Sequence, residues 1–329
     1  MPPTPPPRAA VRVALDAGGL TLSGLLAEPA DEPRGTVFAL HGGGMSAGYF
    51  DGRAHPSVSL LALGARLGFT VLAVDRPGYG ASAPHLPDGA DRVEQADLIR
   101  AAFADFAARH ALGDGVLLLG HSFGGQVALT AAARGFHERL VGLDLSGCGH
   151  RYASGPTPEG CPVDGPRDPR STWGPPSLYP PGTLAAGVDL MCDPPAVEAA
   201  EAARWPRDFP AVAARTTVPV RLTFAEHEAC WRHDAEALAE LTAHFTAAER
   251  VQVARQPAAG HRISLGWAAA AYHRRALTFF EDLLARVPRP VPSGMDGYPA
   301  GRHPWATATG EEREGTAGAR VPYGARLAL

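Results

Sequence analysis

The chain contains the run Leu117-Leu118-Leu119-Gly120-His121-Ser122-Phe123-Gly124-Gly125, in which the pattern G-x-S-x-G is centred on Ser122. An apolar run at 116–119 leads into the motif, and an Ala-rich helical pattern at 126–134 follows it. A strand that turns sharply into a helix projects a serine hydroxyl, and flanking glycines leave room for the strained backbone. The N-terminus of the following helix favours negative charge at the same place. We therefore interpret Ser122 as a candidate nucleophile rather than as a helix cap.

The rest of the chain alternates short apolar runs with patterns of helical period. Strands are predicted at 11–17, 20–27, 36–40, 69–74, 116–119, 140–145, 218–224 and 251–254. Helices are predicted at 57–67, 92–110, 126–134, 233–245 and 267–287. This alternation indicates the α/β class, with a mostly parallel central sheet flanked by helices. Ligands bind such sheets outside the carboxyl ends of the strands, where the Ser122 turn falls.

One long segment, 147–216, interrupts the alternation. It is crowded with Pro, Gly, Asp and Arg up to about residue 181, and only 196–203 has a helical pattern. We predict that this segment is a cap or lid inserted over the site. The predicted organisation is a disordered N-terminus at 1–10, a core at 11–146 and 217–287, the cap at 147–216 and a loose Pro- and Gly-rich tail at 288–329.

Composition and charge argue against several classes of partner. The net charge of −4 is mild and spread out, which disfavours nucleic acid or an anionic membrane as partner. No apolar run approaches membrane-spanning length, and the N-terminus lacks the order of a signal peptide. The four cysteines show no C-x-x-C spacing, so a zinc site or a redox pair is not expected. We expect a cytoplasmic protein with four free thiols.

A serine hydroxyl is a weak nucleophile and needs an adjacent base, which a third group orients. Among the 13 histidines, His261 lies in the loop between the last predicted strand and the last helix. That position fits the base of a triad in the order serine, acid, histidine. His41 and His121 are interpreted as packing residues beside the neighbouring loops.

The acid of a triad is expected in the loop after the strand that precedes the strand of the histidine. Glu226 and Glu228 both follow the strand predicted at 218–224. A buried carboxylate beside an imidazole fixes its tautomer and stabilises its charged form. Strand alternation cannot choose between the two glutamates, because they lie in the turn. Asp144, inside a predicted strand, is the third candidate.

A glycine run supplies candidate donors for an oxyanion. His41-Gly42-Gly43-Gly44 follows the strand predicted at 36–40, and its glycines let the backbone approach a substrate oxygen closely. The N–H of Gly43, with Gly42 as the alternative, and the N–H of Phe123 are the predicted oxyanion hole.

Aromatic and apolar residues near these loops are candidates for substrate binding. Trp173 and Trp205 lie in the predicted cap and are expected to line an apolar pocket, with a purely structural cap as the alternative. Met45, Tyr49 and Phe50 follow the glycine run and are the second set of candidates.

Together these pieces resemble the α/β-hydrolase superfamily, over about Val11 to Val287. The matching motifs are HGGG at 41–44, DRPGYG at 75–80, GHSFGG at 120–125 and GH at 260–261. In many members the acid is the Asp of a G-x-x-D turn, and residues 225–228 align with that turn. The resemblance therefore implies Glu228 as the acid, with Ala in place of Gly and Glu in place of Asp. It also implies a cap inserted after Leu145.

From these features we expect a serine hydrolase that cleaves a carboxylic ester, lactone or thioester through an acyl-enzyme. Ser122, His261 and Glu228 would carry the reaction, with a small-molecule acyl substrate and without a metal or organic cofactor. An acyltransferase or a C–C hydrolase would use the same triad, and a non-catalytic binder would share the fold. A serine at this turn disfavours epoxide or haloalkane hydrolysis, which in this superfamily usually starts from a carboxylate.

Overall fold

The computed structural model describes residues 9–153, 173–188 and 190–287. Residues through Val287 belong to one compact unit. The predicted tail at 288–329, and most of the predicted disordered N-terminus, lie outside the described residues. Eight strands form one sheet, and their bounds are β1 Val11–Asp16, β2 Thr21–Ala27, β3 Gly35–Leu40, β4 Phe69–Val74, β5 Val116–His121, β6 Leu140–Ser146, β7 Val220–His227 and β8 Val251–Gly260.

The sheet is mostly parallel, as the sequence predicts. Its strand order is β1-β2-β4-β3-β5-β6-β7-β8. The β1 and β2 pairings are antiparallel, and every pairing from β4 through β8 is parallel. The parallel strands therefore deliver their C-terminal loops to one edge, where ligands bind in open α/β sheets.

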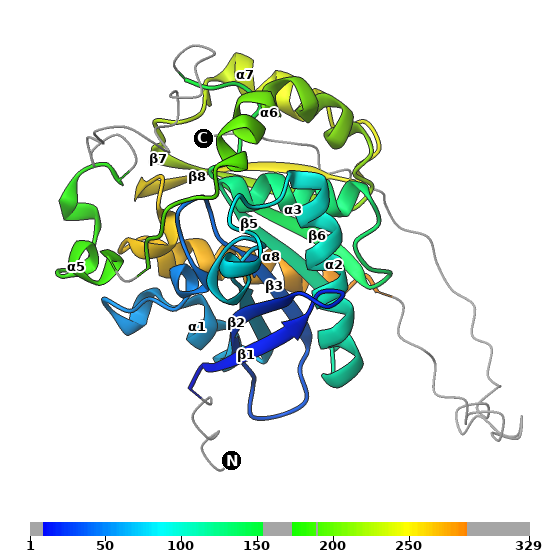
Figure 1. Cartoon of the computed structure of the whole chain (residues 1–329). Coiled ribbons are helices and arrows are strands. Elements are labelled where there is room, and N and C mark those ends of the chain that lie inside the picture. The colour runs from blue at the N-terminus through cyan, green and yellow to red at the C-terminus, as the bar shows by residue number, and fades with distance from the viewer. Residues whose placement is uncertain (1–8, 154–172, 189, 288–329) are drawn as a thin grey trace, which may run out of the picture. The chain divides into compact units, whose positions relative to one another are not determined.

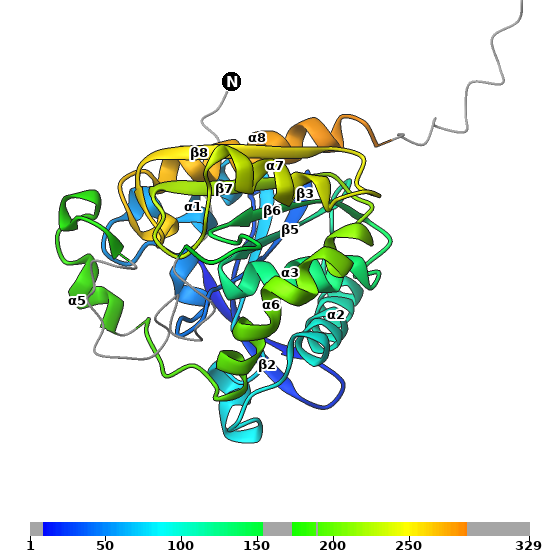
Figure 2. The same cartoon turned by 90° about the horizontal axis from the view of Figure 1, so that it is seen from above.

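Helices cover both faces of this sheet (Figures 1 and 2). Figure 2 shows α8 on one side of the sheet, and α2, α3 and α6 on the other. The α-helices are α1 Leu60–Arg66, α2 Arg92–Arg109, α3 Phe123–Ala133, α5 Thr183–Val188, α6 Val197–Ala214, α7 Ala235–Ala243 and α8 Ala269–Leu284. Short 3-10 turns occur at Ala47–Phe50, Pro56–Val58, Gly80–His85, Pro176–Leu178 and Ile263–Leu265. No helix in the described part of the chain is long and apolar enough to span a membrane.

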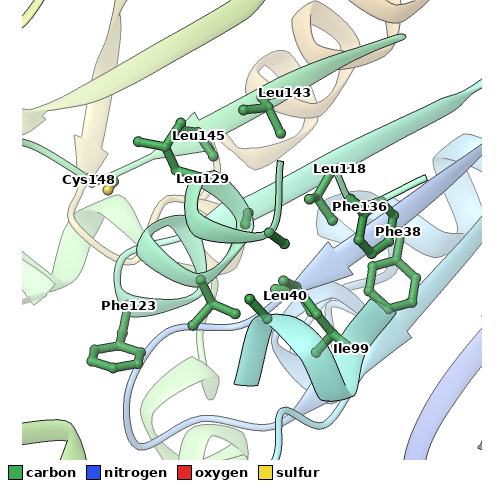
Figure 3. Packing of buried hydrophobic residues seen from close by; sticks show 14 of the residues in the cluster. Phe38, Leu40, Ile99, Leu118, Phe123, Leu129, Phe136, Leu143, Leu145 and Cys148 are labelled. Carbon is green, nitrogen blue, oxygen red and sulfur yellow. The ribbon is translucent and has the colours of Figure 1, made fainter. Parts of the chain in front are cut away.

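Two large apolar clusters form most of the core, one on each face of the sheet, and a third, small cluster contains Ala225, Ala259, Ile263 and Tyr272. Alternation along the strands divides the side chains: Phe38 of β3 belongs to the first cluster and its neighbours Val37 and Ala39 to the second. Figure 3 shows the first cluster, where Leu118 of β5 and Phe38 lie near Phe136. All six residues of β3 and of β5 are buried, as expected for central strands covered by helices on both faces.

Helix α6 is longer than the sequence predicts. The helical pattern predicted from the sequence covers only 196–203. Pro206 and Pro210 follow it, and proline inside a helix removes a backbone donor and clashes with the preceding turn. In the structure the helix continues through both prolines to Ala214. Its buried stripe of Trp205, Phe209 and Ala213 packs into the same cluster as α3, and this burial outweighs the lost hydrogen bonds.

Trp205 is therefore not a pocket residue, which corrects the expectation that it binds substrate. Its side chain is fully buried, and its indole Nε1 donates to the Gly149 carbonyl over 2.8 Å. Its ring packs edge-on against Phe209 and beneath the Arg92 guanidinium. A large aromatic group with a satisfied N–H is a typical core residue.

Strands β7 and β8 both run further than predicted, to His227 and Gly260. A bulge between Ala225 and His227 lets the two strands stay paired near their ends. Because β8 extends to Gly260, the strand ends at the residue before His261 and positions the loop of the candidate base.

Replacing Trp205 by Ala should lower the free energy of unfolding by about 3–5 kcal/mol, because it empties a large buried volume in the core. Urea denaturation measures this change. Trp267→Ala is the matched control, since that indole is 46% exposed and its loss should change stability by no more than about 0.5 kcal/mol. Equal stability of the two variants would contradict the core role of Trp205.

Candidate active site

Ser122 lies between β5 and α3 in a backbone conformation that is rare for residues other than glycine. Its φ is 51° and its ψ is −120°, and its N–H donates to the Ser146 carbonyl over 2.8 Å. A Cβ on Gly124 would lie 2.3 Å from the His41 carbonyl oxygen, so only glycine fits there. The close approach of the two backbones holds the strained turn in place.

The structure brings His261 and Glu228 to this serine. His261 Nε2 lies 3.1 Å from Ser122 Oγ, and its Nδ1 lies 2.9 Å from each carboxylate oxygen of Glu228. The Glu228 carboxylate is fully buried and the imidazole is 7% exposed. A carboxylate at Nδ1 places the proton on that nitrogen, which leaves Nε2 free to accept the proton of the serine.

The loop of Glu228 contains a backbone contact to the carboxylate and a disulfide-bonded cysteine. The N–H of Cys230 donates to Glu228 Oε1 over 2.9 Å, and Cys230 is disulfide-bonded. Cys148 and Cys192 are the free cysteines of the described residues. The expectation of four free thiols is therefore wrong. Because disulfides are typical of oxidising compartments, the cytoplasmic expectation loses the support that it drew from the cysteines.

The other two candidate acids lie elsewhere. Glu226 Oε2 accepts the N–H of Ala258 over 2.7 Å at the surface. Asp144 is fully buried, and it accepts from Arg221 over 2.5 Å and from the Tyr272 hydroxyl over 2.9 Å. Each carboxylate therefore has its own partners, and neither contacts His261 through a hydrogen bond in the described structure.

The glycine run lies against the nucleophile. A Cβ on Gly42 would lie 3.1 Å from Ser122 Cβ, so this backbone passes directly beside the serine. The N–H of Gly44 is already engaged, because it donates to the Tyr79 hydroxyl over 3.1 Å. The N–H groups of Gly42 and Gly43 remain as candidates, together with Phe123, whose N–H at the start of α3 has no acceptor within the helix.

The two histidines interpreted as packing residues are buried beside this run. His41 Nε2 accepts the N–H of Arg76 over 3.0 Å, and its Nδ1 lies 2.8 Å from the Gly42 carbonyl. Burial, and then the Arg76 charge, lowers the pKa of His41 well below its usual range. His121 stacks on Tyr49, and burial lowers its pKa well below the usual range as well. Both rings are therefore neutral near pH 7.

A buried ion pair supports the same loop from the other side. The Arg76 guanidinium is fully buried, and its Nη1 lies 2.5 Å from Glu198 Oε1 on α6. Its Nε donates to the His41 carbonyl over 2.8 Å. The Tyr79 hydroxyl donates to Glu198 Oε2 over 2.7 Å while it accepts the N–H of Gly44. Glu198 thus positions the glycine run through two intermediaries.

Sequence reasoning did not assign roles to these supporting residues. Arg76 and Tyr79 belong to the DRPGYG motif. This motif indicated the family, but it did not indicate that either residue contacts Glu198. Glu198 lies on α6, and the described elements β5, β6, α2, α3 and α5 come between it and that motif; its segment was predicted as cap. No local pattern marks a glutamate whose partner lies at the end of another strand.

Met45, Tyr49 and Phe50 are placed in the core rather than in an open pocket. All three side chains are fully buried in the cluster that contains α1 and α8. The Tyr49 hydroxyl accepts the N–H of Ser264 over 3.3 Å, and its ring stacks on His121 with centroids 4.7 Å apart. These residues support the histidine loops from within, in contrast to the expectation that they contact substrate.

Trp173 lies near the loop of the candidate base. Its carbonyl accepts the Tyr179 hydroxyl over 2.5 Å, and the Arg262 guanidinium lies 4.9 Å from the centre of its ring. A Cβ on Gly260 would lie 2.0 Å from the Trp173 carbonyl oxygen. The absence of a side chain at Gly260 therefore lets this part of the predicted cap dock beside His261.

A cavity of about 550 Å³ adjoins the acid loop. Among the described residues it is lined by Gly174, Pro175, Pro176, His227, Glu228 and Ala229. These described residues include the acid but neither Ser122 nor His261, so the cavity adjoins the acid loop rather than the nucleophile.

The sequence matches the Alpha/beta hydrolase family over residues 37–310. The protein belongs to this family, as the sequence motifs predicted. No curated protein matched the sequence.

Several solved structures share the fold. A thermostable carboxyl esterase from Bacillus coagulans superposes with a TM-score of 0.63 at 15% identity, covering 84% of this chain and 99% of the esterase. The 2-hydroxy-6-oxo-6-phenylhexa-2,4-dienoate hydrolase of Rhodococcus sp. strain RHA1 gives 0.59 at 19% identity, covering 83% and 99%. A dienelactone hydrolase from Anabaena variabilis gives 0.51 at 18% identity, covering 84% and 99%. At these identities the likeness establishes the fold, and the substrate must be argued from the site.

Replacing Glu198 by Gln should lower the free energy of unfolding by about 3–5 kcal/mol, because the Arg76 charge is left buried without its counter-ion. It should also slow reaction of Ser122 with an activated ester, since the glycine run loses its support. Urea denaturation and ester turnover measure the two effects.

Glu249→Gln is the control for this variant. The Glu249 side chain is 63% exposed and pairs with an exposed Arg286, so its loss should cost less than about 1 kcal/mol. A Glu198→Gln protein as stable as Glu249→Gln would show that the buried pair does not support the loop.

Proposed function

We propose that this protein is a serine hydrolase that cleaves a carboxylic ester, lactone or thioester through an acyl-enzyme. The observation that carries the proposal is the continuous contact from Ser122 Oγ through the imidazole of His261 to Glu228. The family and the esterase among the similar structures support a hydrolase. A strained serine with a buried, oriented base has no evident structural purpose.

In the proposed first step, His261 Nε2 takes the proton of Ser122 as Oγ attacks the acyl carbon. The carbonyl electron pair moves onto the substrate oxygen, which becomes an oxyanion. The imidazole is then charged, and the Glu228 carboxylate stabilises it through Nδ1–H. The charge forms in a buried site, where such an interaction is stronger than in water.

The oxyanion is stabilised by two backbone donors in this proposal. One is the N–H of Phe123, and the other is the N–H of Gly43 or Gly42. Because Gly42 passes beside Ser122 and Arg76 holds the loop through His41, these donors need little reorganisation as charge develops. The dipole of α3 adds positive potential at the same place.

Collapse of the intermediate returns the electron pair to the carbonyl and breaks the bond to the leaving group. His261 donates its Nε2 proton to the departing alcohol or thiol. Water then repeats the sequence on the acyl-enzyme, with His261 as base and Ser122 Oγ as leaving group. All three residues return to their starting protonation, so the cycle needs no metal or organic cofactor.

Ser122→Ala should abolish covalent labelling by a fluorophosphonate and lower turnover of an activated ester by on the order of 10⁴ or more. The nucleophile is lost while the fold remains, which a thermal melt checks. The exposed Ser57→Ala variant is the control and should label like the wild type. Labelling that persists in Ser122→Ala would contradict the proposed nucleophile, and absence of labelling in the wild type would favour a non-catalytic binder.

Glu228→Gln and Glu226→Gln form a matched pair that tests the acid. Loss of the orienting carboxylate lets the imidazole adopt the wrong tautomer, at a cost of about 10⁴ in a comparable serine enzyme. Glu226 contacts only a surface backbone N–H in the described structure, so its variant should retain near-normal turnover. A crippled Glu226→Gln with an active Glu228→Gln would reverse the assignment.

A further inference from the structure

Three side chains of metal-binding type meet away from the active site. His150, Glu240 and His244 each offer one ligand atom, and these atoms all lie within 4.8 Å of one another. His150 belongs to the segment that follows β6, whereas Glu240 lies on α7 and His244 caps its end. The i, i+4 spacing of Glu240 and His244 puts both on one face of the helix. That face is directed toward His150.

His150 is the unusual member of this group. It is only 3% exposed, and neither ring nitrogen makes a hydrogen bond of acceptable geometry among the described residues. Its Nε2 lies 3.3 Å from Glu240 Oε2, but the alignment is poor for a hydrogen bond. Buried polar groups are nearly always satisfied, and one without a partner destabilises the fold unless something fills its place.

The surroundings suit a bound cation. Phe209 packs against both imidazoles, with centroids 5.6 Å from His150 and 5.7 Å from His244. Glu240 is exposed and His244 is half-buried, which leaves an approach from solvent. Arg151 Nη1 donates to Glu240 Oε2 over 2.7 Å, so the carboxylate already faces a cationic group.

We propose that His150, Glu240 and His244 form a binding site for a divalent transition-metal ion of the Zn²⁺ type. Two imidazoles and one carboxylate are a ligand set that Zn²⁺ takes in tetrahedral geometry, with water in the fourth position. The ion would satisfy the buried ring of His150 and complete its coordination with two ligands from α7.

Such an ion would link α7 to the segment after β6. That segment begins at Gly147, where a Cβ would lie 2.8 Å from the His261 ring. The Gly147 carbonyl accepts the indole N–H of Trp231 over 2.7 Å, and the Gly149 carbonyl accepts that of Trp205. The metal therefore stabilises a segment that packs against the candidate base, without touching the reacting atoms.

Titration of the untagged, metal-free protein with Co²⁺ tests the site, because the intensity of its visible absorption reports four-coordinate geometry. We expect one Co²⁺ per chain, displaced by Zn²⁺, and a higher melting temperature with either ion. His244→Ala should weaken binding by more than about tenfold, since loss of even a supporting partner costs 10- to 100-fold. His244 is half-buried, so this variant keeps most of the core intact.

Arg151→Ala provides a test of opposite sign. Removing the guanidinium frees Glu240 and should tighten Co²⁺ binding by roughly two- to fivefold, the range of a surface ion pair. Weaker binding in Arg151→Ala would contradict the role of Glu240 as a ligand. If His150 has only a structural role, neither His244→Ala nor Arg151→Ala should change the Co²⁺ spectrum, and that result would contradict the proposed site.

Two control variants separate this site from other histidines. His55 is exposed and is not one of the three proposed ligands, so His55→Ala should bind Co²⁺ like the wild type. His261→Ala should also retain it, because the triad is a separate group. The proposal is overturned if no Co²⁺ binds at millimolar concentration, if His244→Ala binds as tightly as the wild type, or if only His261→Ala loses the ion.

Discussion

The buried charge of Arg76 is the constraint on which the arrangement of the site depends. A fully buried guanidinium is stable only when its donors are satisfied, and here they reach Glu198, Gln95 and the His41 carbonyl. Those partners lie on α6, on α2 and at the end of β3. The cationic face also lies 4.9 Å from the ring of Phe123, the residue after the serine. One side chain therefore ties the sheet edge, the glycine run and α6 to the nucleophile turn.

The acid loop is supported in a different way, by backbone and covalent bonds rather than by charge. Glu228 is fully buried, so its carboxylate needs the N–H of Cys230 as well as the imidazole. Cys230, two residues beyond the acid, is disulfide-bonded. The acid loop and the glycine run therefore differ in the groups that support them.

Much of the fold and of the candidate site was predictable because its signals are local. The G-x-S-x-G turn needs a strand before it and a helix after it, and both are visible as patterns within a few residues of Ser122. The order of strands predicts that His261, Glu226 and Glu228 share one edge, because parallel strands place their C-terminal loops there, and the family resemblance implied Glu228. The catalytic roles of His261 and Glu228 remain predictions, but the contact between them lies at the edge that the strand order implies.

The predictions that were wrong concern contacts between distant segments. Trp205 is an aromatic residue in the predicted cap, which suggested a pocket residue. It packs into the core because α6 continues through two prolines. Cys230 has no C-x-x-C neighbour, and its disulfide depends on a partner that no spacing rule identifies. Met45, Tyr49 and Phe50 lie next to the glycine run in sequence but turn inward to the cluster on the other face of the sheet.

The sequence by itself determined the class of fold, the nucleophile turn and the chain order of the candidate triad, since hydrophobic period and glycine placement act over short distances. The tertiary structure alone decided which donors of the glycine run stay free and where Arg76 finds its counter-ion. Those outcomes depend on the burial of charged and polar groups that lie far apart in the chain. A buried charge pairs with a group that lies close to it in the folded chain. The sequence pattern does not show which residues distant in the chain become such neighbours.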